Sequence, residues 1–377
     1  MGYYHNATVL KNGLVFADGR FVETDAAFSE GRIVAVAESI DADEMIDCSG
    51  LYVLPGLCDI HLHGCAGHDV CDGSAASIDA IAEYQYSRGV TCFCPTTMTL
   101  PTERLKEILR SISGYTRSCA RKGRAEVAGI NLEGPFVSAK KCGAQKSEYI
   151  QSPSAEKLDE LLSAANGLVK LVTIAPEVEG AIDCISACSD KVRFSLGHTD
   201  CGHDCARRAF MAGADHLTHL FNAMPPFHHR DTGPVGAAFD DGRCYVELIC
   251  DGVHISPTAV RAAFRLFGDE RIVLISDSME AAGMPDGEYS LGGQRVIKKA
   301  ARATLSDGTL AGSVSDLYDC LVTAVEMGIP FESAVRAATL NPCRSVGIDD
   351  RYGSIAVGKS AHFLLLDRKD LSIKMVI

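Results

Sequence analysis

Residues 56–64 read GLCDIHLHG, an apolar run that ends in two histidines one position apart. Apolar runs of this kind, without a regular polar alternation, are typical of parallel strands buried on both faces. Seven comparable runs follow: GVTCFCPTTM (89–98), EVAGINLEGPF (126–136), LVKLVTIAPE (168–177), KVRFSLGHT (191–199), ADHLTHLFNAM (214–224), YVELICDGVH (245–254) and RIVLISDSM (271–279).

Helical patterns lie between most of these runs, several with Ser or Pro at the start and Gly just past the end. They span residues 74–88, 101–121, 154–165, 201–212 and 256–267. Eight strands alternating with helices predict an α/β protein built as a (β/α)₈ TIM-type barrel. The alternative is a doubly wound open sheet, but HLHGCAGHD (61–69) lacks the glycine spacing of a dinucleotide turn.

The two ends of the chain have a different texture. The first fifty-odd residues are short alternating runs separated by Gly, Asp and Asn, as in β-hairpins. The last 25 residues, GSIAVGKSAHFLLLDRKDLSIKMVI, repeat this pattern. Because chain ends often lie close together, we expect residues 1–54 and 355–377 to form one small β-sandwich domain, with the barrel at 55–354.

The composition is that of a folded, acidic protein. The chain has 377 residues, 47% of them hydrophobic, and a formal net charge of −13. A general affinity for nucleic acid or acidic membranes comes from clustered Lys and Arg, so neither partner is expected. No apolar stretch reaches the length of a membrane span.

Sixteen cysteines are scattered through apolar segments, and the initial MGYYHNATVLKNG contains no apolar signal region. Disulfide frameworks are typical of small secreted domains. We therefore expect reduced thiols in a cytoplasmic protein, with the cysteines packed as small hydrophobic groups.

Metal-competent side chains stand at the ends of several predicted strands. In a barrel these ends meet on one face, where active sites are built. A single histidine at a strand end is more often structural, but imidazoles and carboxylates on several strands indicate one convergent site. A metal ion held there with an open coordination position would activate a water molecule for hydrolysis. A carboxylate such as Asp277 could accept the proton of that water. The residues are His61, His63, Glu133, His198, His219, His254 and Asp277.

Longer segments carry a resemblance to a known family. They are PGLCDIHLHG, NLEGPF, SLGHT, THLFNAMPPFHHRDTGPVGAAF, CDGVHI, SDSMEAAGM and AATLNPCRSVG. They resemble the amidohydrolase superfamily, in particular its branch of amino-sugar-phosphate deacetylases. The resemblance implies a barrel with a small β-sandwich, a homodimer, and hydrolysis of the acetamide of an N-acetylated amino-sugar 6-phosphate to acetate and an amine.

The resemblance also implies roles for the strand-end residues. Glu133, His198 and His219 would hold the main catalytic metal, and His61, His63 and Glu133 a second one. Asp277 would be the general base and acid. One or two divalent ions per subunit are expected, with zinc first and iron, manganese and cobalt equally suited to these ligands.

Further positions match family residues that touch the sugar phosphate. Arg230 is expected to reach the site of the neighbouring subunit, where a guanidinium fork suits a phosphate. The full set is Ala144, Asn222, Ala223, Arg230, His254, Leu310, Ala311 and Gly312.

Several alternatives stay open at this point. The gluco and galacto epimers of the substrate are not separated by the sequence. A cyclic-amide amidohydrolase commonly carries a carbamylated Lys on the fourth strand, but that strand ends in TIAPE (173–177). A non-catalytic scaffold would be expected to lose metal ligands. His216 is expected to point away from the site, and His68, His228, His229 and Asp251 are left unassigned.

Overall fold

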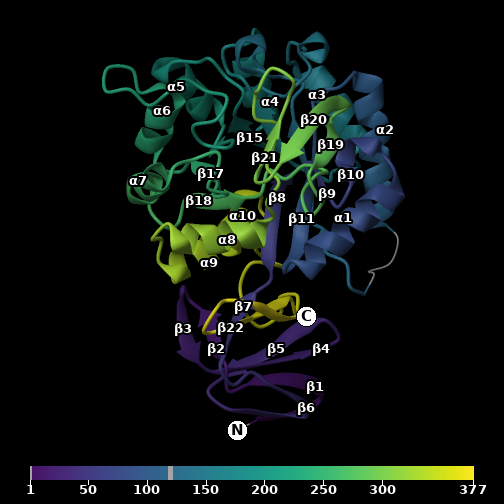
Figure 1. Cartoon of the computed structure of the whole chain (residues 1–377), viewed down its shortest axis with the longest axis vertical. Helices are drawn as coiled ribbons and strands as arrows, with labels where there is room; N and C mark the ends of the chain where they lie inside the picture. The colour runs from purple at the N-terminus through teal and green to yellow at the C-terminus, as the bar shows by residue number, and fades with distance from the viewer. Residues whose placement is uncertain (1, 118–121) are drawn as a thin grey trace.

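The computed structural model describes residues 2–117 and 122–377. Figure 1 shows a large barrel above a smaller β unit that contains both chain ends. The barrel has eight parallel strands in sequence order, as expected of a (β/α)₈ barrel. They are β8 (Leu57–Leu62), β11 (Val90–Thr97), β13 (Ile130–Glu133), β14 (Val169–Ile174), β15 (Arg193–Leu196), β16 (His216–Leu217), β17 (Tyr245–Ile249) and β18 (Ile272–Ile275).

The first and last barrel strands are joined at their carboxyl ends by backbone hydrogen bonds. The N–H of Asp277 donates to the carbonyl of His61 at 2.9 Å, and the N–H of His63 donates to the carbonyl of Ser278 at 2.7 Å. These bonds place the segment after β18 directly beside the two histidines.

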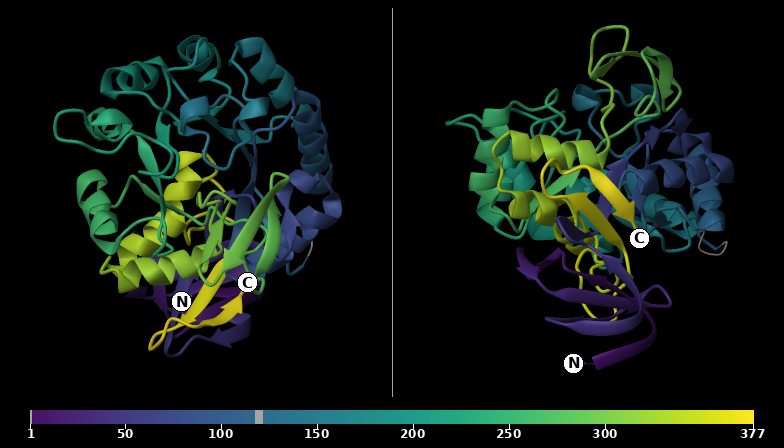
Figure 2. Two further views of the ribbon diagram at one scale, coloured as in Figure 1. Left: turned by 45° about the horizontal axis from the view of Figure 1, so that its top comes forward. Right: turned by 60° about the horizontal axis from the view of Figure 1, so that its bottom comes forward.

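Helices cover the outside of the barrel (Figures 1 and 2). Ser74, Ser154 and Ser256 cap α1, α3 and α7 by accepting backbone N–H groups, which confirms Ser as the start signal of these helices. The predicted helix over 101–121 is α2, which ends at Thr116; residues 118–121 lie outside the described residues. The helices are α1 (Ala75–Ser87), α2 (Thr102–Thr116), α3 (Ala155–Ala164), α4 (Ala181–Cys188), α5 (His203–Ala212), α6 (Gly233–Asp241), α7 (Pro257–Phe267), α8 (Leu317–Glu326), α9 (Phe331–Ala338) and α10 (Leu340–Ser345).

The β unit at the bottom of Figure 1 consists of two sheets. The strand order is β5-β4-β1-β6 in one sheet and β23-β22-β7-β2-β3 in the other. The strands are β1 (Gly2–Lys11), β2 (Leu14–Ala17), β3 (Arg20–Glu23), β4 (Asp25–Ser29), β5 (Arg32–Ala37), β6 (Ile40–Asp47), β7 (Leu51–Pro55), β22 (Phe363–Asp367) and β23 (Ile373–Val376).

The two chain ends meet in this unit. Strand β22 pairs antiparallel with β7, with Phe363 opposite Pro55. Side chains from both sheets, among them Leu10, Ile33, Val53 and Phe363, share one buried cluster. The expected β-sandwich built from both termini is therefore present, while the boundaries 1–54, 55–354 and 355–377 stay a prediction.

A three-stranded antiparallel sheet follows β18 and stands above the barrel (Figure 2). It consists of β19 (Gly287–Leu291), β20 (Gln294–Lys299) and β21 (Arg302–Thr304). We call this sheet the flap. Short strands β9 (Gly64–Cys65), β10 (His68–Asp69) and β12 (Glu126–Val127) complete the sheets.

The cysteines pack in the interior. All fifteen cysteines in the described part of the chain are free, and most are buried. Cys58, Cys92 and Cys343 share an apolar cluster between β8, β11 and α10. Among the described helices none is long and apolar enough to cross a membrane.

Candidate active site

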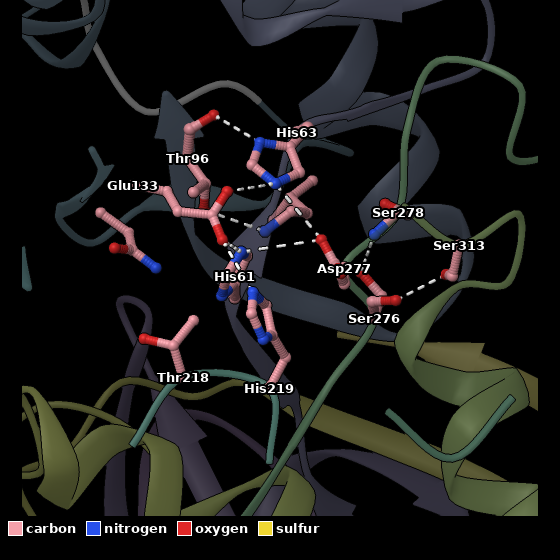
Figure 3. Close-up of polar contacts among 12 residues, drawn as sticks. His61, His63, Thr96, Glu133, Thr218, His219, Ser276, Asp277, Ser278 and Ser313 are labelled. Carbon is pink, nitrogen blue, oxygen red and sulfur yellow. Dashed lines mark hydrogen bonds and ion pairs between the residues drawn. The ribbon is translucent and has the colours of Figure 1, made fainter. Parts of the chain in front are cut away.

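The expected strand-end residues converge on one point at the carboxyl ends of the barrel strands. Figure 3 shows His61, His63, Glu133, His219 and Asp277 directed toward one another, and His198 joins them from the segment after β15. None of the six is more than 8% exposed. Because His61 and His63 are two positions apart in an extended segment, both rings reach the same side.

Three of the residues have an unusual backbone conformation. His198, His219 and Asp277 have φ of 46°, 28° and 48°, in the left-handed region that residues other than glycine seldom adopt. Each stands two residues past the end of its strand. Such strain persists where the surrounding structure imposes it, and it commonly marks functional positions.

Glu133 is the centre of the group. Its Oε1 lies 3.0 Å from Nε2 of His198 and 3.1 Å from Nε2 of His219. The same oxygen is 3.4 Å from Nε2 of His61, while Oε2 is 3.2 Å from Nε2 of His63. The potential donor atoms form two sets that share Glu133, one with His61 and His63 and one with His198 and His219, and within each set all atoms lie within 4.8 Å of one another.

The electrostatics of the group follow from burial and from the mutual contacts. Burial by itself lowers the pKa of His63, but hydrogen bonds to Asp277 and Glu133 raise it to about 9. Burial also lowers the pKa of His61, yet the charges of Glu247 and Glu133 raise it well above its usual value. Burial opposes ionisation of Glu133, but the nearby His198 and His61 hold its pKa well below the usual range. The buried carboxylates thus favour positive charge in this group.

A divalent cation fits this donor set. Imidazole nitrogens and a carboxylate are the ligands of zinc and related ions. Nε2 of His61 is buried and has no hydrogen-bond partner among the described residues, although it faces Glu133. A metal would provide the missing partner and the positive charge.

Asp277 lies beside the second set. Its Oδ1 is 3.2 Å from Nε2 of His63 and 3.6 Å from Nε2 of His61. Burial raises the pKa of this carboxyl, but the hydrogen bond from His63 and the charge of His61 outweigh burial and lower it. Asp277 is therefore ionised at neutral pH and able to accept a proton.

A cavity of ≈ 370 Å³ opens onto the group. Of the residues expected to contact substrate, six line it: Ala144, Asn222, Ala223, His254, Leu310 and Gly312. Ala311 is fully buried, and its N–H donates to the carbonyl of Ala303, so it supports the loop rather than lining the cavity. Arg230 is exposed on the loop before α6, outside the cavity, and its guanidinium contacts His229 at 2.9 Å.

His254 is oriented by Asp251, which the sequence left unassigned. Nδ1 of His254 lies 2.7 Å from Oδ2 of Asp251, and two backbone N–H groups of the same turn donate to Oδ1. Burial lowers the pKa of His254, but the hydrogen bond and charge of Asp251 raise it. The ring therefore presents Nε2 to the cavity.

Two further residues, Gln145 and Glu247, support the ligands. Nε2 of Gln145 donates to Oε2 of Glu133 at 2.6 Å, and its Oε1 accepts the N–H of Thr99. Glu247 lies beneath the histidines, with Oε2 2.9 Å from Nδ1 of His61. A signal existed for Glu247, because a single Glu inside the apolar run YVELIC indicates a buried charge; nothing in the sequence marked Gln145.

The prediction for His216 was wrong. The residue is fully buried, with Nε2 3.6 Å from Oε1 of Glu247, and does not point away from the site. The reason is that β16 has only two residues, so the chain turns at Thr218 and strand alternation does not continue to His219.

The cavity also contains residues that the sequence did not single out. They are Met98, Lys141, Gly143, Gln145, Leu291 and Thr309. Leu291 comes from the flap, so the inserted sheet forms part of the cavity wall.

Comparisons with known proteins identify the family of the chain. The model of the Amidohydrolase family matches residues 52–377. An N-acetylglucosamine-6-phosphate deacetylase of Bacillus subtilis is 38% identical over 363 residues, covering 95% of this chain and 89% of the relative. An N-acetylgalactosamine-6-phosphate deacetylase of Escherichia coli O157:H7 is 38% identical over 316 residues, 83% of each chain.

Solved structures of similar proteins cover the chain almost completely. A mutant N-acetyl-D-glucosamine-6-phosphate deacetylase of Mycobacterium smegmatis in complex with N-acetyl-D-glucosamine-6-phosphate superposes with a TM-score of 0.92 at 31% identity, over 99% of this chain and 98% of the other. The N-acetylglucosamine-6-phosphate deacetylase of Thermotoga maritima superposes with a TM-score of 0.87 at 31% identity, over 98% of this chain and 97% of the other.

Proposed function

The chain belongs to the amidohydrolase family, and from that premise we propose that it hydrolyses the acetamide of N-acetyl-D-glucosamine 6-phosphate to D-glucosamine 6-phosphate and acetate. The observation that carries the proposal is the convergence of His61, His63, Glu133, His198, His219 and Asp277 on one point, where all of them except His61 line one cavity. The named activity of relatives that match nearly the whole of this chain supplies the substrate.

In this proposal the enzyme depends on one or two divalent ions. Glu133, His198 and His219 would hold the main ion, and His61, His63 and Glu133 would hold the second. A metal bound by such ligands brings the pKa of a coordinated water near neutrality and polarises the carbonyl under attack. Zinc is the first choice, and iron, manganese and cobalt suit the same ligands.

Asp277 is the proton carrier. The carboxylate lines the cavity and its pKa is lowered, so it begins the reaction ionised. It accepts the proton of the attacking water and returns it to the nitrogen of the leaving amine. A single group thus acts first as base and then as acid.

The remaining cavity residues position the sugar phosphate. His254 directs Nε2 toward the sugar, while Asn222, Ala144, Ala223 and the loop 310–312 shape the pocket. The cavity volume is within the range of about 300–1,000 Å³ typical of small-molecule sites. In a homodimer, Arg230 binds the phosphate of the substrate that occupies the cavity of the neighbouring subunit. This role accounts for its exposed position outside the cavity of its own chain.

A cytoplasmic location is part of the proposal. Fifteen free cysteines in the described part of the chain suit a reducing compartment.

Acetate release from purified protein tests the reaction. Metal-free protein should be inactive, and readdition of zinc should restore release of acetate from N-acetyl-D-glucosamine 6-phosphate. If zinc, iron and manganese each fail to restore it, the proposal is wrong.

The galacto epimer is a second candidate substrate. The specific observation is the N-acetylgalactosamine-6-phosphate deacetylase of Escherichia coli O157:H7, which is as similar as the Bacillus subtilis enzyme over the aligned region. Measuring kcat/KM for both epimers decides the preference, and a higher value for the galacto epimer would transfer the proposal to it.

A further inference from the structure

Glu247 on β17 is a carboxylate that the proposed reaction does not use. Its side chain is completely buried below the metal ligands. Oε2 lies 2.9 Å from Nδ1 of His61 and accepts the backbone N–H of His219 at 3.1 Å. A buried carboxylate is costly unless it is paired, so its presence beneath the site calls for a role in the site.

The contact fixes the state of His61. A carboxylate only accepts hydrogen bonds, so Nδ1 of His61 carries a proton directed at Glu247. In the neutral ring the lone pair is then on Nε2. Nε2 is 3.4 Å from Glu133 and 3.6 Å from Asp277, which places the lone pair at the second ligand set.

The other ligand histidines are held differently. Nδ1 of His63 lies 3.3 Å from the carbonyl of Thr96, and Nδ1 of His198 lies 2.9 Å from the carbonyl of Lys141. Nδ1 of His219 has no hydrogen-bond partner in the part of the chain that the structure describes. Among these four rings, His61 is the one whose Nδ1 is paired with a side-chain carboxylate within the described residues.

The second oxygen of Glu247 contributes little. Nε2 of His216 lies 3.6 Å from Oε1, beyond hydrogen-bond distance, and Oε1 has no hydrogen-bond donor among the described residues. The interaction with His61 is therefore carried by Oε2.

We propose that Glu247 is a positioning residue for the second metal site: it fixes the tautomer and orientation of His61 and so strengthens binding of a divalent cation by His61, His63 and Glu133. The inference rests on the proposed metal dependence and adds a residue that acts on one ion and not on the other. Carboxylate partners of ligand histidines typically change metal affinity by roughly 10- to 100-fold.

The test is a zinc titration of the metal-free full chain against a chromophoric chelator, without substrate. Wild-type protein should bind two ions. In Glu247→Gln, which keeps an oxygen for the N–H of His219 but loses the charge, the first ion should bind as in wild type. The second should bind roughly 10- to 100-fold more weakly.

Asp251→Asn is the matched control. It alters another buried carboxylate paired with a histidine Nδ1, but His254 is outside both ligand sets. Both zinc affinities should equal those of wild type, which separates the effect on His61 from the general effect of neutralising a buried acid.

Loss of a cooperative unfolding transition in Glu247→Gln would show that this variant is not properly folded. In that case Glu247→Asp is titrated in its place. Aspartate keeps the charge but withdraws it from Nδ1 of His61 by one methylene, so weaker binding of the second ion is again expected. Equal weakening of both ions, no change, or a single ion in wild-type protein would overturn the inference. Acetate release by the same wild-type sample reports on the proposed function separately, because zinc binding is measured without substrate.

Discussion

At the scale of single residues, Asp59 shows how the site affects stability. Its carboxyl is completely buried two positions before His61 and accepts the hydroxyl of Ser276 at 2.5 Å. Burial, only partly offset by this and other hydrogen bonds, raises its pKa from 3.8 to about 7. In the unfolded chain the group loses its proton near the ordinary pKa, so the folded state binds more protons between these values. Stability contributed by the protonated form is present below pH 4 and is lost as pH rises to 7.

Asp59→Asn should therefore change the pH dependence of stability. The variant has no proton to lose, and the hydroxyl of Ser276 can still pair with the amide. The free energy of unfolding of the variant minus that of wild type should be larger at pH 8 than at pH 5 by on the order of 1–4 kcal/mol. Denaturant titrations of the metal-free proteins at both pH values measure this, and an equal difference at the two would contradict the assignment.

Asp277 carries the prediction for catalysis. Asp277→Asn keeps the shape of the side chain but cannot accept the proton of water, so kcat should fall by roughly 10²- to 10⁴-fold. Zinc stoichiometry should be unchanged, since neither ligand set requires Asp277. Asp200→Asn, at a partly exposed carboxylate that does not line the cavity, serves as control and should keep wild-type kcat. A comparable loss in both variants would remove the special role of Asp277.

The same scale shows how far sequence reasoning reaches into a site. His61, Glu133 and His219 could be anticipated because each ends an apolar run, and strand ends of a barrel meet in space. Gln145 could not, because it reaches Glu133 from a loop whose path no periodicity describes. His216 was placed wrongly because strand alternation holds only as long as the strand continues.

At the scale of elements, the barrel strands were readable as apolar runs, but the flap was not among them. Strand β19 alternates polar and apolar residues, and a Gly292–Gly293 turn joins it to β20. This is a hairpin signal, with glycine supplying the positive φ of 54° and 78°. It was overlooked because a half-exposed antiparallel sheet does not have the pattern of a buried parallel strand.

The flap is tied to the cavity by specific bonds. The N–H of Gly292 donates to Oδ2 of Asp69 at 2.9 Å, and the side-chain amide of Gln294 donates to the carbonyl of Ala144. Leu291 thereby stays in the cavity wall. Substrate binding is expected to depend on this attachment.

Gln294→Ala should raise KM by about fivefold, because one hydrogen bond is worth about 1 kcal/mol. Zinc stoichiometry should stay the same, since the flap provides no ligand. Arg295→Ala is the neighbouring control: its guanidinium pairs with Glu288 on the exposed side of the flap. Steady-state kinetics of the two variants measure the effect. Equal KM values would show that the attachment of the flap does not contribute to substrate binding.

At the scale of the whole molecule, the position of Arg230 connects function to assembly. The side chain is exposed and lies outside the cavity of its own chain, so within one subunit it is not placed to meet the phosphate. The proposed homodimer resolves this by completing each cavity with Arg230 of the other subunit. Each active site should then require Asp277 of one subunit and Arg230 of the other.

Mixing two inactive variants tests this arrangement. Arg230→Ala lacks the phosphate contact and Asp277→Asn lacks the base, so each homodimer should have very low kcat/KM. In a mixed dimer, the Arg230→Ala subunit keeps its own Asp277 and receives Arg230 from its partner. After dissociation and random reassociation, half of the dimers are mixed and each has one complete site of two. About one quarter of wild-type activity should therefore return. If Arg230 instead served the cavity of its own chain, neither site of the mixed dimer would be complete and mixing would restore no activity.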